Sequence, residues 1–201
     1  MEFLIYIVIF VLIIISAYFL LFKSKIINKN DNKFEFFIKN IKLYMKRYHP
    51  KITIDYKIID LSKTEKNIKV RKTLIIEDIA NQFYSYNFVK STQKAIAKEK
   101  LWPTYIDNPP TSSYPNDWLQ RKEFAYTRDN KSCSRCGQNL LSLNEVYTSF
   151  VRPIKDGGGY NFENIITLCI DCNKIIESNL QKSSVINSLK LYDDLLKFIV
   201  D

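Results

Sequence analysis

Residues 133–136 read CSRC, and residues 169–172 read CIDC. These two pairs hold all four cysteines of the 201-residue chain, and 32 residues separate them. Two CxxC pairs at this kind of spacing are typical of a zinc site, because each pair can lie on a tight turn that directs both sulfurs to one point. Gly137, directly after the first pair, suits such a turn. The expected zinc ligands are Cys133, Cys136, Cys169 and Cys172.

Other chemistries for four cysteines are two disulfides, a redox dithiol and an iron–sulfur cluster. The cytoplasm keeps thiols reduced, which disfavours disulfides if this part of the chain lies there, and a redox site needs only one CxxC pair. A site closed by four cysteines leaves no open position for a substrate. We therefore expect a structural zinc ion that stabilises the fold and performs no chemistry.

The segment between the cysteine pairs has the composition of two short strands joined by a glycine-rich turn. The first strand is predicted over 145–154, the turn over 156–159 and the second strand over 161–168. A helix is predicted to begin near Asp171, within the second cysteine pair. The expected local order is therefore strand, turn, strand and helix.

The motifs of this region resemble those of HNH endonucleases. Residues 128–130 read RDN, CSRC is followed by glycine, the first strand runs into Pro153, and residues 163–173 read ENIITLCIDCN. The resemblance covers residues 114–180, about a third of the chain. It implies a ββα-metal fold, which a zinc ion held by four cysteines often braces.

The resemblance also implies roles for individual positions. Counting back from Pro153, Ser149 stands at the position that binds a divalent metal, and Phe150 stands at the position of the histidine general base. Asn164 matches the asparagine that braces the loop and orients the base, and Asn173 matches the last position, which is His or Asn on the helix. Asn164 and Asn173 fit the family's pattern, whereas Ser149 and Phe150 depart from it.

These departures bear directly on phosphodiester hydrolysis, which needs a base next to the attacking water and a metal beside the phosphate. Phenylalanine accepts no proton, and serine is a weak, neutral metal ligand. The only histidine, His49, lies far from the site in the sequence. Glu145 or Asp156 could replace the base, although neither stands at the family's position. We predict that Phe150 is a core residue that fills the histidine's volume.

A second feature is the uncharged run from Phe3 to Phe22, in which every residue except Ser16 is apolar or aromatic. As a helix, this run would be about 30 Å long, the thickness of a bilayer core. A signal peptide would need a basic start and a shorter apolar core, and a buried helix of this length would be unusual in so small a protein. We therefore expect a transmembrane helix over 1–22.

Positive charge is concentrated beside this run. Residues 23–100 hold 19 Lys or Arg against 8 Asp or Glu, whereas residues 101–201 hold 11 against 12, within a net charge of +9. Residues 23–51 alone hold 9 basic and 2 acidic residues, a juxtamembrane collar that anionic lipid would attract. Because positive charge marks the cytoplasmic side, we expect a single-pass membrane protein whose C-terminal body lies in the cytoplasm.

We therefore predict an α+β chain in four parts. The transmembrane helix (1–22) is followed by a basic juxtamembrane α+β region (23–100) and then by a linker (101–116) that contains four of the six prolines. The HNH-like zinc module with flanking helices occupies residues 117–201.

Secondary structure outside the zinc module is predicted from apolar periodicity. Helical spacing indicates a helix over 33–48, and a second helix is expected over 77–100. Alternating apolar residues indicate a strand over 51–60, with a hairpin partner over 67–76. An amphipathic helix is expected at the end of the chain, over 184–200.

Three functions are consistent with this sequence. In the first, a zinc module at the inner membrane face binds nucleic acid or a protein partner without catalysis. In the second, the chain is an active DNA endonuclease that uses Mg²⁺ or Mn²⁺ and a non-standard base. In the third, the module is purely structural and the function belongs to residues 23–100. No motif indicates a small-molecule substrate. The candidates for phosphate contact are Arg128, Lys131, Arg135, Arg152 and Lys155.

Overall fold

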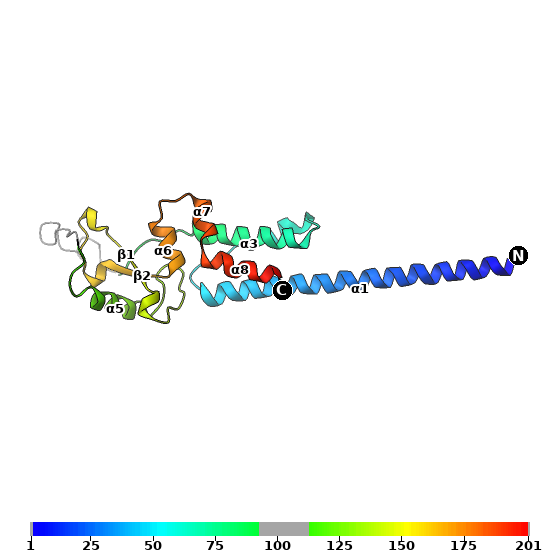
Figure 1. The fold of residues 1–201 in the computed structure, drawn as a ribbon, viewed down its shortest axis with the longest axis horizontal. Coiled ribbons are helices and arrows are strands. Elements are labelled where there is room, and N and C mark those ends of the chain that lie inside the picture. The colour runs from blue at the N-terminus through cyan, green and yellow to red at the C-terminus, as the bar shows by residue number, and fades with distance from the viewer. Residues whose placement is uncertain (1, 93–112, 201) are drawn as a thin grey trace. The chain divides into compact units, whose positions relative to one another are not determined.

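The computed structural model describes residues 2–92 and 113–200. The chain divides into two compact units, residues 1–42 and residues 43–201. The predicted linker over 101–116 lies outside the described residues, apart from 113–116. The helices (Figure 1) are α1 (Glu2–Tyr48), α2 (Ile58–Leu61), α3 (Ile68–Ser85), α5 (Trp118–Arg128), α6 (Ile170–Glu177), α7 (Lys182–Asn187) and α8 (Lys190–Val200). The strands are β1 (Tyr147–Phe150) and β2 (Ile165–Leu168).

Helix α1 is continuous over 47 residues (Figure 1). The helices predicted over 1–22 and 33–48 are therefore parts of one helix, and neither glycine nor proline occurs between them to end it. Against our prediction for residues 1–22, no helix in the described part of the chain is both long enough and apolar enough to cross a membrane.

The strands predicted over 51–60 and 67–76 are wrong, and the regular elements in the described part of the basic region are helices. The helix predicted over 77–100 ends at Ser85 as part of α3, and residues 93–100 lie outside the described residues. Asn67 begins α3, because its side-chain oxygen accepts hydrogen bonds from the backbone N–H groups of Lys69 (3.0 Å) and Val70 (3.4 Å). The last two residues of the segment predicted as a strand, Ile75 and Ile76, lie instead on the buried face of this helix, whereas Val70 is exposed. Burial at helical spacing has therefore overridden strand propensity. The buried apolar residues of α3 are Ile75, Ile76, Ile79, Ala80 and Phe83.

The predicted first strand corresponds to an extended segment that has no partner strand among residues 2–92 and 113–200, where β1 and β2 pair with each other. Ile52 and Ile54 are buried, so the alternation in the sequence does reflect burial. The Gln82 side chain of α3 takes the place of a neighbouring strand. It accepts a hydrogen bond from the Asp55 backbone N–H (2.8 Å) and donates one to the Asp55 carbonyl (2.7 Å).

The helix predicted over 184–200 is divided into α7 and α8. The buried Asp171 of α6 explains the division, because its carboxylate accepts from the backbone N–H groups of Lys190 (2.8 Å) and Leu191 (2.9 Å). Such a carboxylate satisfies two donors that a helix N-terminus leaves free. A new helix therefore begins at Lys190.

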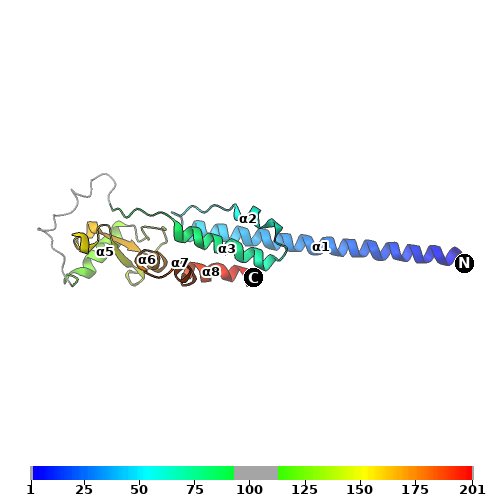
Figure 2. The ribbon, with the colours of Figure 1, turned by 90° about the horizontal axis from the view of Figure 1, so that it is seen from above.

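Unit 43–201 joins the end of the basic region to the zinc module. Helices α3 and α8 lie side by side in both views (Figures 1 and 2), and Lys72 donates to the Phe198 carbonyl at 3.3 Å. The Lys51 backbone N–H donates to the Cys136 carbonyl at 3.1 Å. The segment after α1 is thus bound to the first cysteine pair.

The sheet of the module consists of β1 and β2, which pair antiparallel with Tyr147 opposite Leu168 and Phe150 opposite Ile165. Both strands are shorter than predicted, and short 3-10 turns occupy residues 143–145, 154–156 and 162–164 beside them. All four residues of β2 are buried. Helix α6 follows directly, so the predicted order of strand, turn, strand and helix is confirmed.

His49 is a buried polar residue of this unit. Its side chain is only 2% exposed, its ring lies 4.9 Å from that of Phe83, and neither ring nitrogen has a hydrogen-bond partner among the described residues. Burial is the main reason why the pKa of His49 falls from 6.5 to about 4. The folded state therefore favours the neutral imidazole. The stability that this provides is present above the unfolded pKa and is lost as the pH falls toward the folded pKa.

We predict that replacing His49 by phenylalanine makes the unit less sensitive to acid. Between about pH 7 and pH 5, the free energy of unfolding of wild type should fall by about 2 kcal/mol more than that of His49→Phe, because only wild type must protonate a buried imidazole. Denaturant titrations at each pH, with zinc present, measure this difference. The exposed Tyr48→Phe variant is the control and should follow wild type. Parallel curves for His49→Phe and wild type would contradict the prediction.

Candidate metal centre

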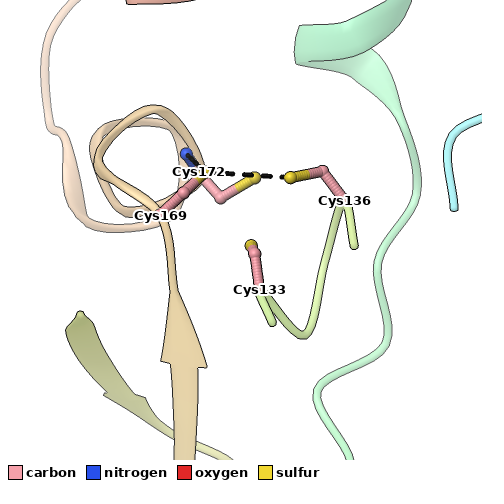
Figure 3. A group of neighbouring side chains, drawn as sticks. All are labelled: Cys133, Cys136, Cys169 and Cys172. Carbon is pink, nitrogen blue, oxygen red and sulfur yellow. Dashed lines mark hydrogen bonds between the residues drawn. The ribbon is translucent and has the colours of Figure 1, made fainter. Parts of the chain in front are cut away.

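The four cysteine side chains converge on one buried point, as predicted (Figure 3). Their sulfurs all lie within 4.8 Å of one another, and each residue is at most 1% exposed. The first pair lies on the turn after α5, and the second pair lies at the start of α6. The cluster therefore joins the two ends of the segment that contains the β1–β2 hairpin.

The geometry of the sulfurs fits a tetrahedral zinc ion. The Cys136 and Cys169 sulfurs are 3.7 Å apart. The corresponding edge of a ZnS₄ tetrahedron is about 3.8 Å for Zn–S bonds of about 2.3 Å. Contact with the Cys133 sulfur, and to a lesser extent burial, raises the pKa of the Cys136 thiol above its ordinary value, so its anionic form is disfavoured. Four buried thiolates would therefore need a cation between them. A structural Zn²⁺ ion would supply that charge.

Backbone hydrogen bonds form the turn that holds the first cysteine pair. The Gly137 N–H donates to the Cys133 carbonyl at 2.9 Å, and the Cys133 N–H donates to the Gln138 carbonyl at 2.8 Å. Gly137 has a left-handed φ of 81°, and a Cβ there would lie 3.0 Å from the side chains of Pro50 and Lys51. Both the backbone conformation and the space thus favour glycine at this turn.

The second cysteine pair lies at the N-terminus of a helix. Cys169 is the N-cap of α6, and its sulfur accepts a hydrogen bond from the Cys172 backbone N–H at 3.4 Å. The helix dipole favours a thiolate at this end.

Ser149, at the family's metal-ligand position, is buried on β1 and held between two charged side chains. The Lys90 ammonium donates to its Oγ at 2.8 Å, and its hydroxyl donates to the Glu177 carboxylate at 2.6 Å. Lys90 and Glu177 also form an ion pair at 3.7 Å. The Lys90 ammonium therefore lies against the oxygen to which the HNH resemblance assigns a divalent metal.

Phe150, at the family's base position, belongs to an aromatic cluster. Its ring centroid lies 5.7 Å from that of Tyr160 and 6.1 Å from that of Trp118. Phe150 was predicted to be a core residue, but it is half-buried. It belongs to a packed aromatic cluster at the surface. Tyr114 extends the cluster by stacking on Trp118 at 4.5 Å.

Asn164 holds the loop that follows β1. It is fully buried, its Oδ1 accepts from the Arg152 backbone N–H (2.8 Å), and its Nδ2 donates to the carbonyls of Arg152 (2.9 Å) and Gly159 (2.8 Å). Gly158 completes this arrangement, because a Cβ there would lie 2.1 Å from the Arg152 carbonyl oxygen. This loop architecture requires both an asparagine and a glycine.

The remaining candidates for a catalytic site are Asn173, Glu145, Asp156 and His49. Asn173 is on α6, one helical turn before Glu177. Glu145 is exposed and accepts from the Leu141 backbone N–H at 3.1 Å. Asp156 is exposed in the turn after β1, and neither carboxylate is hydrogen-bonded to Ser149 among the described residues. His49 is enclosed by aromatic rings.

Three of the five residues predicted to contact phosphate are engaged within the protein. Arg135 is only 2% exposed, which makes that prediction wrong for this residue. Arg128 pairs with Asp129 at 2.9 Å and donates to the Ile165 carbonyl at 2.6 Å, and Arg152 donates to the Asp156 carbonyl at 2.7 Å. The exposed candidates are Lys131 and Lys155.

Lys90 and Glu177 were not predicted from the sequence. Helical spacing could have indicated Glu177, since it follows Asn173 by four residues on one helix and therefore shares its face. No feature of the sequence indicated Lys90. It is one lysine among many in a basic region, and long-range folding places it against Ser149.

We predict that the purified chain contains one zinc ion and depends on it for stability. Cys169→Ser removes one of the four ligands, so it should abolish stoichiometric zinc binding and lower the thermal midpoint by about 10 °C or more. Elemental analysis and thermal scans measure both quantities. Ser132→Ala, next to the first pair, is the control and should retain zinc. A metal-free wild type with an unchanged midpoint after chelation would contradict the prediction.

Comparisons with known proteins agree with this geometry. No curated protein and no solved structure matches the chain. Residues 133–179 match the family model described as HNH endonuclease. The four-cysteine cluster within this range fits the zinc-binding module of that family, so the resemblance seen in the sequence is confirmed for this segment.

Proposed function

We propose that this chain is an HNH-like zinc protein that binds a nucleic acid or a protein partner and has lost the catalytic base. The observation that carries the proposal is the side chain at the base position. Phe150 has no atom that accepts a proton, and its ring packs between Trp118 and Tyr160. A water molecule at this position would meet aromatic carbon in place of an imidazole nitrogen.

The surroundings of Ser149 support the same conclusion. A divalent cation bound to Ser149 Oγ would share that oxygen with the Lys90 ammonium, which lies 2.8 Å away. The two positive charges would repel each other at close range. Lys90 instead supplies the positive charge that balances Glu177. The scaffold held by Asn164 is thus retained without its reactive groups.

An active endonuclease is the alternative, and one observation favours it. Glu177 is a carboxylate beside the metal-ligand position, 2.6 Å from Ser149. Carboxylate oxygens are ligands that Mg²⁺ and Mn²⁺ prefer. If Lys90 moved away, Ser149 and Glu177 would offer two oxygens to such a cation. The base would still have to come from another residue.

We predict that the full-length chain does not nick supercoiled plasmid with Mg²⁺ or Mn²⁺, because it has neither a base nor an open metal position. A Lys90→Met/Ser149→Asp/Phe150→His variant removes the ammonium and restores both family residues, so it should cut. The same triple variant with Cys169→Ser is the control for contaminating nucleases and should be inactive.

Metal-dependent nicking by wild type that Cys169→Ser abolishes would contradict the proposal and support the alternative.

A gel-shift assay with the same plasmid separates the two partner classes. Retarded DNA that is released by Lys131→Ala/Lys155→Ala supports a nucleic-acid partner, because these two lysines are the exposed phosphate candidates. Unretarded DNA favours a protein partner.

Membrane attachment by the N-terminal segment is a further part of the proposal. It rests on the uncharged run from Phe3 to Phe22 and on the exposure of apolar side chains within it, such as Phe10 (65%) and Phe19 (72%). Such apolar surface favours an apolar environment. The basic residues of 23–51 would then contact anionic lipid, with the C-terminal body in the cytoplasm.

We predict that wild type stays with membranes after alkaline carbonate extraction. An Ile9→Arg/Ile13→Arg variant should be extracted, because each charge costs about 3 kcal/mol within a bilayer. Protease added to the cytoplasmic face of sealed vesicles should remove the C-terminal body. Extraction of wild type would contradict attachment, and protection of the body would contradict its orientation.

A further inference from the structure

Arg135 is a buried arginine between the cysteine cluster and the end of α3. Its Nη1 donates to the Cys172 sulfur at 3.5 Å. Its Nη2 donates to the carbonyls of Phe83 (2.5 Å), Tyr84 (3.2 Å) and Tyr86 (3.3 Å), at the C-terminal end of α3. The guanidinium also lies 5.2 Å from the Phe83 ring centroid and 5.5 Å from that of Tyr86. One side chain therefore contacts both a metal ligand and a helix terminus.

A guanidinium that is 2% exposed needs compensating negative charge. Among the described residues, no carboxylate pairs with Arg135; its hydrogen-bond acceptors are the three carbonyls and the sulfur. The carbonyls belong to the negative end of the α3 dipole, which supplies only partial charge. The Cys172 sulfur is the remaining source.

Zinc would hold that sulfur in place. A zinc ion with four thiolates carries a net charge of about −2, so the loaded cluster offers Arg135 a strong acceptor at a fixed position. Without the ion, the metal would no longer hold the Cys172 sulfur against the guanidinium, which would remain buried beside the partial charge of the helix terminus.

We infer that Arg135 couples zinc binding to the docking of the C-terminal end of α3. The loaded cluster holds the guanidinium, and the guanidinium holds the three carbonyls that end the helix. In return, the helix dipole keeps the guanidinium against the sulfur and disfavours release of the metal. The segment that leaves α3 here also carries Lys90 to Ser149. This inference does not depend on the proposed loss of catalysis.

The test uses the zinc-loaded full-length chain and two readouts that need no enzymatic activity. The first readout is the rate of zinc transfer to a chromogenic chelator in excess. The second is amide hydrogen exchange of residues 81–87, measured by mass spectrometry while zinc is bound. Arg135→Met removes the charge, and Arg135→Lys keeps it on a group that cannot bridge the sulfur and three carbonyls. Arg121→Met is the matched control, because Arg121 donates to the Tyr160 carbonyl at 2.9 Å and to no cysteine.

Arg135→Met should release zinc about tenfold faster than wild type, because loss of a contact to a metal ligand weakens metal binding by about this factor. The amide hydrogens of residues 81–87 should also exchange about tenfold faster. Arg135→Lys should be intermediate in both rates, and Arg121→Met should match wild type in both. A wild-type value of either rate in Arg135→Met would overturn the coupling. If Arg135→Met does not fold, Arg135→Lys decides in the same way, since a wild-type value of either rate would again overturn it.

Discussion

Four buried sulfurs that need a shared cation are the constraint on which the rest of unit 43–201 depends. The sheet consists of two four-residue strands, which is too little to be stable alone. The cysteine cluster joins the turn before this hairpin to the helix after it. The first pair also contacts the segment after α1 through Lys51, and Arg135 extends the connection to α3. A zinc ion in the cluster would therefore stabilise elements from both ends of the unit.

This arrangement is consistent with the proposal that an HNH-like scaffold persists here after loss of the catalytic base. The shape of the loop after β1 depends on Asn164 and Gly158, and the position of α6 depends on Cys169. None of these needs a reactive group at Ser149 or Phe150. Those two positions are instead filled by packing and charge pairing, with aromatic rings around Phe150 and the Lys90–Glu177 pair around Ser149. Selection for the fold and selection for catalysis would thus act on different side chains.

The parts of the fold that local sequence determines could be predicted, and the parts that tertiary contacts determine could not. The spacing of the cysteines was sufficient to predict the metal cluster, and the composition of the segment between them predicted the order of strand, turn, strand and helix. The strand predicted over 67–76 was wrong, because the sequence pattern does not reveal that Ile75 and Ile76 pack on a helix face. The break before Lys190 depends on Asp171, which lies 19 residues away, and the site at Ser149 depends on Lys90, 59 residues away. Such contacts leave no periodic signal in a single sequence.

The proposed loss of catalysis rests on the lysine ammonium that lies against Ser149, at the position where the HNH resemblance places a divalent cation. Titration of the zinc-loaded full-length chain with Mn²⁺, followed by electron paramagnetic resonance, tests this most directly, because free and bound Mn²⁺ give different signals. We expect the free Mn²⁺ signal of wild type to be undiminished into the millimolar range, whereas Lys90→Met should bind the ion through Ser149 and Glu177. Stoichiometric Mn²⁺ binding by wild type that Glu177→Gln abolishes would show instead that the ion enters beside Ser149.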